Sequence, residues 1–212
     1  MDIAQEIKNL GIGEQEYLKL QNFVALLAEW NEKMNLVSKN SFADVWVRHV
    51  LDSAQLITYL PKNLKHLVDI GSGAGFPAIV LAILVERIIP EAKLTLVESI
   101  TKKTVYLNDV VQKLGLKNVE IINDRVENIG KNTVFKDVDV ITARAVAQLD
   151  VLCSYAKHIG NANTKLLLLK GQKWAEEDTL AQNHWQYDLT MYPNKYCLDG
   201  VVMELLNLRK KR

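Results

Sequence analysis

The 212-residue sequence has few of the residues that crosslink a chain or bind metals. Its two cysteines, Cys153 and Cys197, lie far apart, and its four histidines are scattered at positions 49, 66, 158 and 184. Neither cysteine has a partner at the short spacing of a redox motif or a zinc site. We therefore expect no disulfide framework and no bound metal, which favours a reducing compartment.

Long apolar stretches are also lacking. The longest, residues 76–85, has about half the length of a membrane-spanning helix and contains Pro77. Residues 1–16 have mixed charge and lack the apolar centre of a signal peptide. These absences predict a soluble, cytoplasmic protein that does not bind membranes.

An excess of positive charge is the third missing feature. The chain has 26 basic and 25 acidic residues, and four of the basic ones form the tail at residues 209–212. Residues 1–208 therefore carry a formal net charge of −3. This balance excludes a uniformly basic nucleic-acid binder, so any contact with RNA must come from a local patch. With 49% hydrophobic residues, the chain can bury a substantial core.

Apolar periodicity predicts an α/β protein with a helical cap. Residues 14–36 and 41–60 show helical spacing, and strands then alternate with helices until a closing hairpin. The expected strands are 67–70, 93–98, 119–122, 138–142, 164–169, 185–191 and 200–208, and the later helices are 76–87, 101–114, 148–159 and 173–182. This order predicts a doubly wound, mainly parallel seven-stranded sheet of Rossmann-like type with a C-terminal β-hairpin. We expect the cap to span residues 1–62 and the cofactor-binding core to span 63–212.

The most informative motif is the glycine-rich run that follows the first strand. Gly71, Gly73 and Gly75 come between an apolar strand ending at Ile70 and an apolar helix. This arrangement grips a nucleotide-like cofactor at the carboxyl end of a strand. A dinucleotide fingerprint requires a third glycine at position 76, but that residue is Phe76. The pattern D-x-G-x-G-x-G instead resembles motif I of S-adenosylmethionine (SAM) methyltransferases.

Further polar residues follow the neighbouring strands and are expected at the same edge of the sheet. Glu98 ends the second strand, where an acidic residue accepts hydrogen bonds from ribose hydroxyls. Val126 and Glu127 follow the third strand, where a backbone amide and a small apolar face would hold an adenine. Arg144 follows the fourth strand, where many methyltransferases present a catalytic motif. The alternative is that Glu98 and Arg144 are ordinary surface residues at strand ends.

Together these residues resemble the RsmG (GidB) family of 16S rRNA guanine-N7 methyltransferases. The resemblance covers most of the chain, and the order and spacing of its short motifs make it specific. It rests on Trp30-Asn31, Asn35-Leu36, His49, Asp52-Ser53, the loop Asp69 to Pro77, Glu98-Ser99, Lys102-Lys103, Leu114 to Leu116, Asn118-Val119, Arg125-Val126-Glu127, Ala143 to Ala147 and Lys170-Gly171. Two positions depart from the pattern: Ala78 replaces an expected glycine, and Val37 replaces a common threonine.

The resemblance implies the class I SAM-dependent methyltransferase fold and a specific guanine of bacterial 16S rRNA as substrate. It implies that Gly71, Phe76, the backbone of Val126-Glu127 and Arg144 contact SAM. The partner would be 16S rRNA, the small ribosomal subunit or an assembly intermediate. Nothing in the pattern requires more than a monomer.

The expected chemistry needs no general base, because guanine N7 already presents an in-plane lone pair. Positioning and electrostatic support would then suffice. Arg144 is the candidate catalytic residue, since its guanidinium could hold guanine O6 or a phosphate by a forked contact. The candidate RNA contacts are cations near strand ends: Lys102, Lys103, Arg125, Lys170, Lys173 and the basic tail.

The cap has two polar pairs whose roles stay open. His49 and Asp52 are three residues apart on one expected helical face, and Asn31 and Asn35 are expected to pair likewise. They could line the substrate entry, or they could tie the cap to the sheet by buried hydrogen bonds. Three rival functions also remain: a SAM methyltransferase acting on tRNA, protein or a small molecule, a NAD-binding oxidoreductase, and a non-catalytic ribosome-associated binder.

Overall fold

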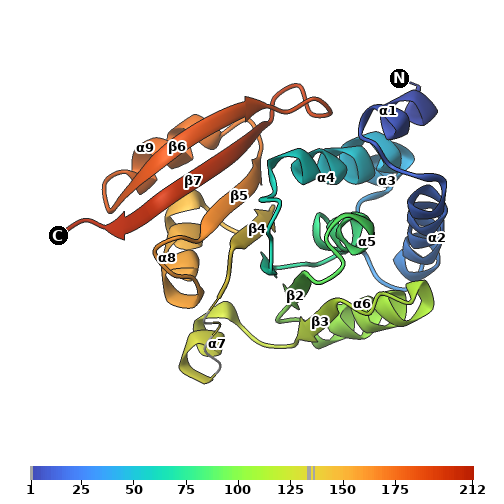
Figure 1. The fold of residues 1–212 in the computed structure, drawn as a ribbon, viewed down its shortest axis with the longest axis horizontal. Coiled ribbons are helices and arrows are strands. Elements are labelled where there is room, and N and C mark those ends of the chain that lie inside the picture. The colour runs from blue at the N-terminus through green and yellow to red at the C-terminus, as the bar shows by residue number, and fades with distance from the viewer. Residues whose placement is uncertain (1, 133–134, 136) are drawn as a thin grey trace.

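A seven-stranded sheet forms the centre of the computed structural model, which describes residues 2–132, 135 and 137–212 (Figure 1). The strands are β1 (His66–Ile70), β2 (Lys93–Val97), β3 (Val119–Ile122), β4 (Val140–Arg144), β5 (Lys165–Lys170), β6 (Trp185–Pro193) and β7 (Val201–Lys210). Their order is β3-β2-β1-β4-β5-β7-β6. The first five are parallel, and β7 runs antiparallel to both β5 and β6. The predicted class I topology with its C-terminal hairpin is confirmed.

Helices cover both faces of the sheet. On one face lie α5 (Ala78–Ile88) and α6 (Thr101–Leu114), together with the cap. On the other lie α7 (Val126–Asn132), α8 (Leu149–Ile159) and α9 (Trp174–Ala181). Successive residues of β1 separate accordingly: Leu67 packs into the first cluster and Val68 into the second. Figure 1 shows the two groups of helices on opposite sides of the sheet.

The cap is more broken than its periodicity predicts. It consists of α1 (Ile3–Asn9), α2 (Glu14–Asn31), α3 (Lys39–Ala43), a π-helical segment η1 (Trp46–Leu51), α4 (Asp52–Ala54) and a 3₁₀ segment η2 (Gln55–Tyr59). The helix expected over 14–36 begins at Glu14 as predicted but ends early, at Asn31. The Oδ1 of Asn31 accepts hydrogen bonds from the amides of Leu36 and Val37, which fixes the chain in a turn. Asn31 and Asn35 therefore share no helical face.

Two helices, α1 and α7, were not predicted. Each has seven residues, too short for a convincing apolar period. The helix expected over 41–60 is present in part, because helical backbone runs without interruption from Trp46 to Tyr59 but as π, α and 3₁₀ segments, and α3 is a separate short helix that ends at Ala43. They still carry apolar residues inward, so the periodicity correctly identified a buried face and missed only the backbone geometry.

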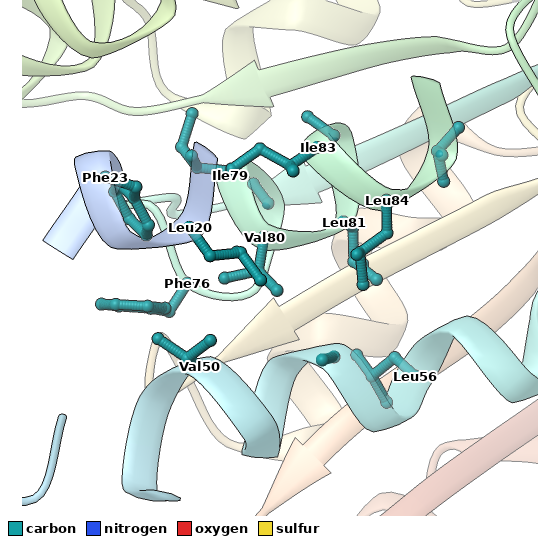
Figure 2. Close-up of a cluster of buried hydrophobic side chains, with 14 of the residues drawn as sticks. Leu20, Phe23, Val50, Leu56, Phe76, Ile79, Val80, Leu81, Ile83 and Leu84 are labelled. Atoms are coloured by element: carbon teal, nitrogen blue, oxygen red, sulfur yellow. The ribbon is translucent and has the colours of Figure 1, made fainter. Parts of the chain in front are cut away.

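The cap and the sheet share one hydrophobic core. Figure 2 shows Leu20 and Phe23 of α2 on one side of Phe76, and Val50 of η1 on the other. Phe23 and Phe76 pack with ring centroids 5.1 Å apart. Ala78, the departure from the family pattern, is fully buried in the first turn of α5, so its methyl group is accommodated. The boundary near residue 62 stays a prediction.

Membrane insertion by a helix finds no support in the described part of the chain, where no helix is both long enough and apolar enough to cross a bilayer.

Candidate functional site

The glycine loop connects β1 to α5 in a left-handed conformation. Gly71, Gly73 and Gly75 have φ angles of 68°, 54° and 88°, which side chains rarely tolerate. A Cβ atom on Gly71 would lie 2.5 Å from Cγ2 of Val146, which follows β4. The amide of Gly71 donates to the carbonyl of Val97 at the end of β2, 2.8 Å away. The predicted glycine turn is therefore present, and it is held by both neighbouring strands.

The carboxylate of Glu98 holds this loop by a hydrogen bond to its backbone. Its Oε2 accepts a hydrogen bond of 2.9 Å from the amide of Gly73, and its Oε1 accepts one of 2.8 Å from the amide of Ile100. The residue is only 5% exposed. Sequence reasoning expected this carboxylate to hold a ribose, which stays a prediction. The contacts that the structure gives it are to backbone amides.

Asp69, which precedes the loop in β1, is a buried carboxylate with incomplete bonding. Its Oδ1 accepts a hydrogen bond of 2.6 Å from the Thr142 hydroxyl, whereas Oδ2 has no partner among the described residues. Burial raises the pKa of Asp69 to about 6, against the opposing effect of hydrogen bonds from Thr142 and Ser72. The sequence showed that Asp69 belongs to the motif, but it did not show that the carboxylate is buried with one oxygen unpaired among the described residues.

Three cavities adjoin one another along the carboxyl edge of the parallel strands. The first, the Val126 cavity, has a volume of about 160 Å³ and lies beside Gly71, Val97, Arg125 and Val126. Val126 is buried at the start of α7, as expected for an apolar face, while Arg125 is exposed at the rim. The side chain of Glu127 points elsewhere, accepting a hydrogen bond of 3.0 Å from the Tyr155 hydroxyl.

The second, the glycine-loop cavity, has a volume of about 300 Å³ and is bordered by the cap. Residues 71–74 and Phe76 form one wall, and residues 36–38 and Ser41 form the other. Lys103 of α6 contributes a cation to the lining. Gly71 is common to this cavity and the Val126 cavity.

The third, the Lys170 cavity, lies beyond Arg144 and has a volume of about 410 Å³. Its lining comes from the ends of β4 and β5, from η1 and α4 of the cap, from α9, and from the loop between β6 and β7. Its carboxylates are Asp52 and Glu177, and Leu169 and Tyr196 are among its apolar residues. His49, Arg144 and Ala145 line both this cavity and the glycine-loop cavity.

Arg144 occupies the wall between these two cavities. Its Nη1 donates to the carbonyl of Arg48 at 3.0 Å and to Oδ2 of Asp52 at 3.1 Å, and its Nη2 donates to Nδ1 of His49 at 2.6 Å. Its guanidinium also lies 5.2 Å from the ring centroid of Phe76. A guanidinium has five N–H donors, so these three contacts leave two for a ligand.

His49 is held as a neutral imidazole by its surroundings. Because Nδ1 accepts from Arg144, the ring proton belongs on Nε2, which contacts the Ser41 hydroxyl. Burial, with the positive charges of Arg144 and Arg48, lowers the pKa of His49 to about 4. The ring stacks on Phe76 with a centroid separation of 5.0 Å. His49 thus joins the cap to the glycine loop.

Asp52 anchors the same network from the cap. Its Oδ1 accepts hydrogen bonds from Gln55 at 3.1 Å and from Asn194 at 2.6 Å. Burial raises the pKa of Asp52, and the hydrogen bond from Asn194 and the charge of Arg144 oppose that rise. His49 and Asp52 therefore tie the cap to the sheet by buried hydrogen bonds, and they also line the Lys170 cavity; a role for the pair at the substrate entry stays a prediction.

The cations expected to hold RNA occupy different environments. Lys102 and Lys173 are exposed, and Lys103 is partly buried. Lys170 departs from the expectation, because it is 9% exposed and its Nζ donates to the carbonyl of Ala147 at 2.9 Å and to Glu177 at 2.5 Å. Sequence reasoning missed Ser41, Gln55, Glu177 and Asn194, which no motif or period distinguishes.

Comparisons with known proteins agree on one family. The sequence profile of rRNA small subunit methyltransferase G (GidB) matches residues 16–197. The chain belongs to this family. Ribosomal RNA small subunit methyltransferase G of Rickettsia akari (strain Hartford) is 38% identical over 192 residues, which cover 91% of this chain and 94% of the relative. The protein of the same name from Allorhizobium ampelinum is 35% identical over 212 residues, covering 99% and 98%.

Solved structures of methyltransferases share the fold of this methyltransferase G family member. A putative O-methyltransferase from Klebsiella pneumoniae superimposes with a TM-score of 0.63 over 95% of this chain and 94% of its own, at 12% identity. A SAM-dependent methyltransferase from Aquifex aeolicus gives a TM-score of 0.57 over 73% and 89%, at 19% identity. At these identities the likeness establishes the fold and nothing further.

Proposed function

We propose that this protein transfers the methyl group of SAM to N7 of a guanine in the 16S rRNA of the small ribosomal subunit. The observation that carries the proposal is the row of adjoining cavities along one edge of the sheet. Gly71 joins the first to the second, and Arg144 and His49 separate the second from the third. Such a row offers room for an extended cofactor in two cavities and for an acceptor base in the third.

The lining of the first two cavities fits SAM. Val97 and Val126 offer apolar surface to an adenine, and Glu98 is the nearby acid for its ribose. The glycine loop would hold the methionine part, because residues 71–74 line the glycine-loop cavity and the positive φ angles of Gly71 and Gly73 are ones that side chains rarely tolerate. Lys103 adds a positive charge to the lining of the same cavity.

The protein's contribution to the reaction would be to orient guanine N7 toward the methyl group of SAM. SAM, when bound, supplies an electrophilic methyl group, and guanine N7 presents its lone pair without prior loss of a proton. Arg144 is fixed by Asp52 and His49 and has two N–H groups left for guanine O6 or a neighbouring phosphate. His49 stays neutral at physiological pH and adds no positive charge beside the sulfonium.

RNA would approach along the surface around these cavities. Lys102 and Lys173 are exposed, and Arg125 lies at the rim of the Val126 cavity. These three, with Lys103 and the basic tail at residues 209–212, would provide phosphate contacts. Lys170 is not among them in this proposal, since its ammonium is already paired with Glu177.

The test is transfer of label from methyl-tritiated SAM. Small subunits purified from cells lacking this activity should accept one methyl group per 16S rRNA, and naked 16S rRNA and tRNA serve as comparison substrates. Calorimetric titration should show binding of SAM and none of NAD. Label that appears in tRNA or protein, with none in 16S rRNA, would overturn the proposal, and so would binding of NAD in place of SAM.

A further inference from the structure

The Lys170 cavity is lined by two carboxylates, Asp52 and Glu177, which differ in whether both of their oxygens already accept hydrogen bonds. Both oxygens of Asp52 are engaged, because Gln55 and Asn194 donate to Oδ1 and Arg144 donates to Oδ2. Glu177 of α9 is only half engaged. The hydrogen bonds of the described residues reach its Oε2 alone, from Nζ of Lys170 at 2.5 Å and from the amide of Leu149 at 2.9 Å. Its Oε1 is therefore available to a ligand.

Glu177 is also rigidly held. Lys170 ends β5 and is buried, and its Nζ is fixed a second time by the carbonyl of Ala147. Leu149 begins α8, so its amide is one of the free donors at that helix end. The side chain of Glu177 keeps 22% exposure in spite of these bonds. A carboxylate whose Oε2 is held at a strand end and a helix end, and whose Oε1 has no partner among the described residues, is suited to recognising a hydrogen-bond donor.

Guanine presents such donors on the edge next to the reacting one. N7 and O6 must face Arg144 and the cofactor cavities, which leaves N1–H and the N2 amino group directed further into the Lys170 cavity. Glu177 lines that cavity and does not line the glycine-loop cavity. An enzyme that reads an extruded base does so through hydrogen bonds to this Watson–Crick edge. Adenine has an acceptor at N1, so a carboxylate there would repel it.

We propose that Glu177 is the residue that selects guanine, by accepting hydrogen bonds from N1–H and the N2 amino group, and that Lys170 positions it. The inference rests on the proposed function, because it assumes that the acceptor base enters the Lys170 cavity. The proposed role of Glu177 also explains why Lys170 is buried and paired with a carboxylate, although it lies at the edge of a site that is expected to bind RNA phosphates.

Substitution of Glu177 by glutamine provides a sharp test. The amide oxygen of the new side chain can still accept from Lys170 and Leu149, so the fold should be kept, and the thermal midpoint should match the wild type. The amide nitrogen would then face the base, where it opposes the guanine donors and suits N1 of adenine. The matched control is Glu176→Gln on the exposed side of the same helix, outside the cavity lining.

The readout is binding of guanosine, inosine and adenosine 5′-monophosphates to enzyme saturated with S-adenosylhomocysteine. The wild type should prefer GMP to IMP and IMP to AMP, and E177Q should lower the GMP-to-AMP affinity ratio by about tenfold or more. E176Q should leave the ratio unchanged. Absence of GMP binding to the wild type, or an unchanged ratio in E177Q, would overturn the assignment.

Methyl transfer separates this inference from the proposed function. If the wild type methylates 16S rRNA and E177Q does so with unchanged kcat/KM, the inference fails and the function stands. If the wild type selects GMP but transfers no methyl group to 16S rRNA, the function fails. If Glu177 selects guanine, E177Q should lower kcat/KM for methylation of the small subunit about tenfold, while its Kd for SAM stays within about twofold of the wild-type value.

Discussion

Gly71→Ala tests whether the glycine loop is shaped for a ligand and not merely for a turn. Alanine at φ 68° costs about 1–2 kcal/mol for the left-handed conformation. Its Cβ would also lie 2.5 Å and 2.9 Å from the two Cγ atoms of Val146, and such overpacking costs about 1–3 kcal/mol more. We expect the free energy of unfolding to fall by about 2–5 kcal/mol, the sum of these two contributions.

Gly115→Ala is the matched control for this substitution. Gly115 has φ 64° at the end of α6, and an added Cβ would meet nothing within 4 Å. It should cost only the about 1–2 kcal/mol of the left-handed conformation, with no change in SAM affinity. The double variant Gly71→Ala with Val146→Ala should recover the overpacking part of the loss.

Urea denaturation and calorimetric titration with SAM measure the two effects of Gly71→Ala. Because the loop must shift to accept the methyl group, the Kd for SAM should rise by at least about tenfold, equivalent to about 1.4 kcal/mol. If Gly71→Ala and Gly115→Ala lost equal stability and both kept the wild-type Kd, the loop would be a turn without a binding role, and the reasoning would be refuted.

Four further predictions concern charge. In the wild type, ionisation of Asp69 should lower the free energy of unfolding by about 3 kcal/mol as the pH rises from about 4 to 6, because a buried acid with a raised pKa stabilises the fold only while protonated, and Asp69→Asn should abolish this fall. His49→Gln should remove a slope of the opposite sign, since the lowered pKa of His49 makes the fold lose stability on acidification. Urea denaturation across this pH range measures both slopes, and slopes that match the wild type would contradict both predictions. Arg144→Ala should lower the free energy of unfolding by about 3 kcal/mol by leaving a buried carboxylate unpaired, and should slow methyl transfer; unchanged turnover and SAM affinity would rule out its catalytic role. Replacing Lys102 and Lys103 together by glutamine should reduce the slope of log K for RNA against log salt by about 2, and an unchanged slope would exclude both from phosphate contact.

The glycine loop and the sheet could be predicted because their signals are local. Alternating strands and helices determined the topology, and the spacing at residues 71–76 distinguished a SAM-type loop from a dinucleotide fingerprint. Arg144 was predictable as a residue at the cofactor edge because strand ends in this architecture meet there. The cavity lining is consistent with that expectation.

The rest of the site depends on contacts that sequence patterns do not encode. Asn194 lies 142 positions from Asp52, and no period or motif connects them, yet the two side chains share a hydrogen bond and both line the Lys170 cavity. Lys170 was expected to contact RNA because it shares the carboxyl edge of the strands with the other candidate cations. Its burial follows from Glu177, a residue of α9 that the sequence did not mark. The end of α2 is a local feature that the apolar period does not encode, because it depends on the Asn31 side chain accepting hydrogen bonds from the amides of Leu36 and Val37.

Chemical mapping of the methylated base in 16S rRNA tests the central claim most directly. Small subunits labelled by the purified enzyme would be treated with borohydride and aniline, which cleave RNA at N7-methylguanine. The account predicts label and cleavage at a single guanine of 16S rRNA, both dependent on added SAM. Incorporated label without cleavage at any guanine, or label confined to another base, to ribose or to protein, would contradict it.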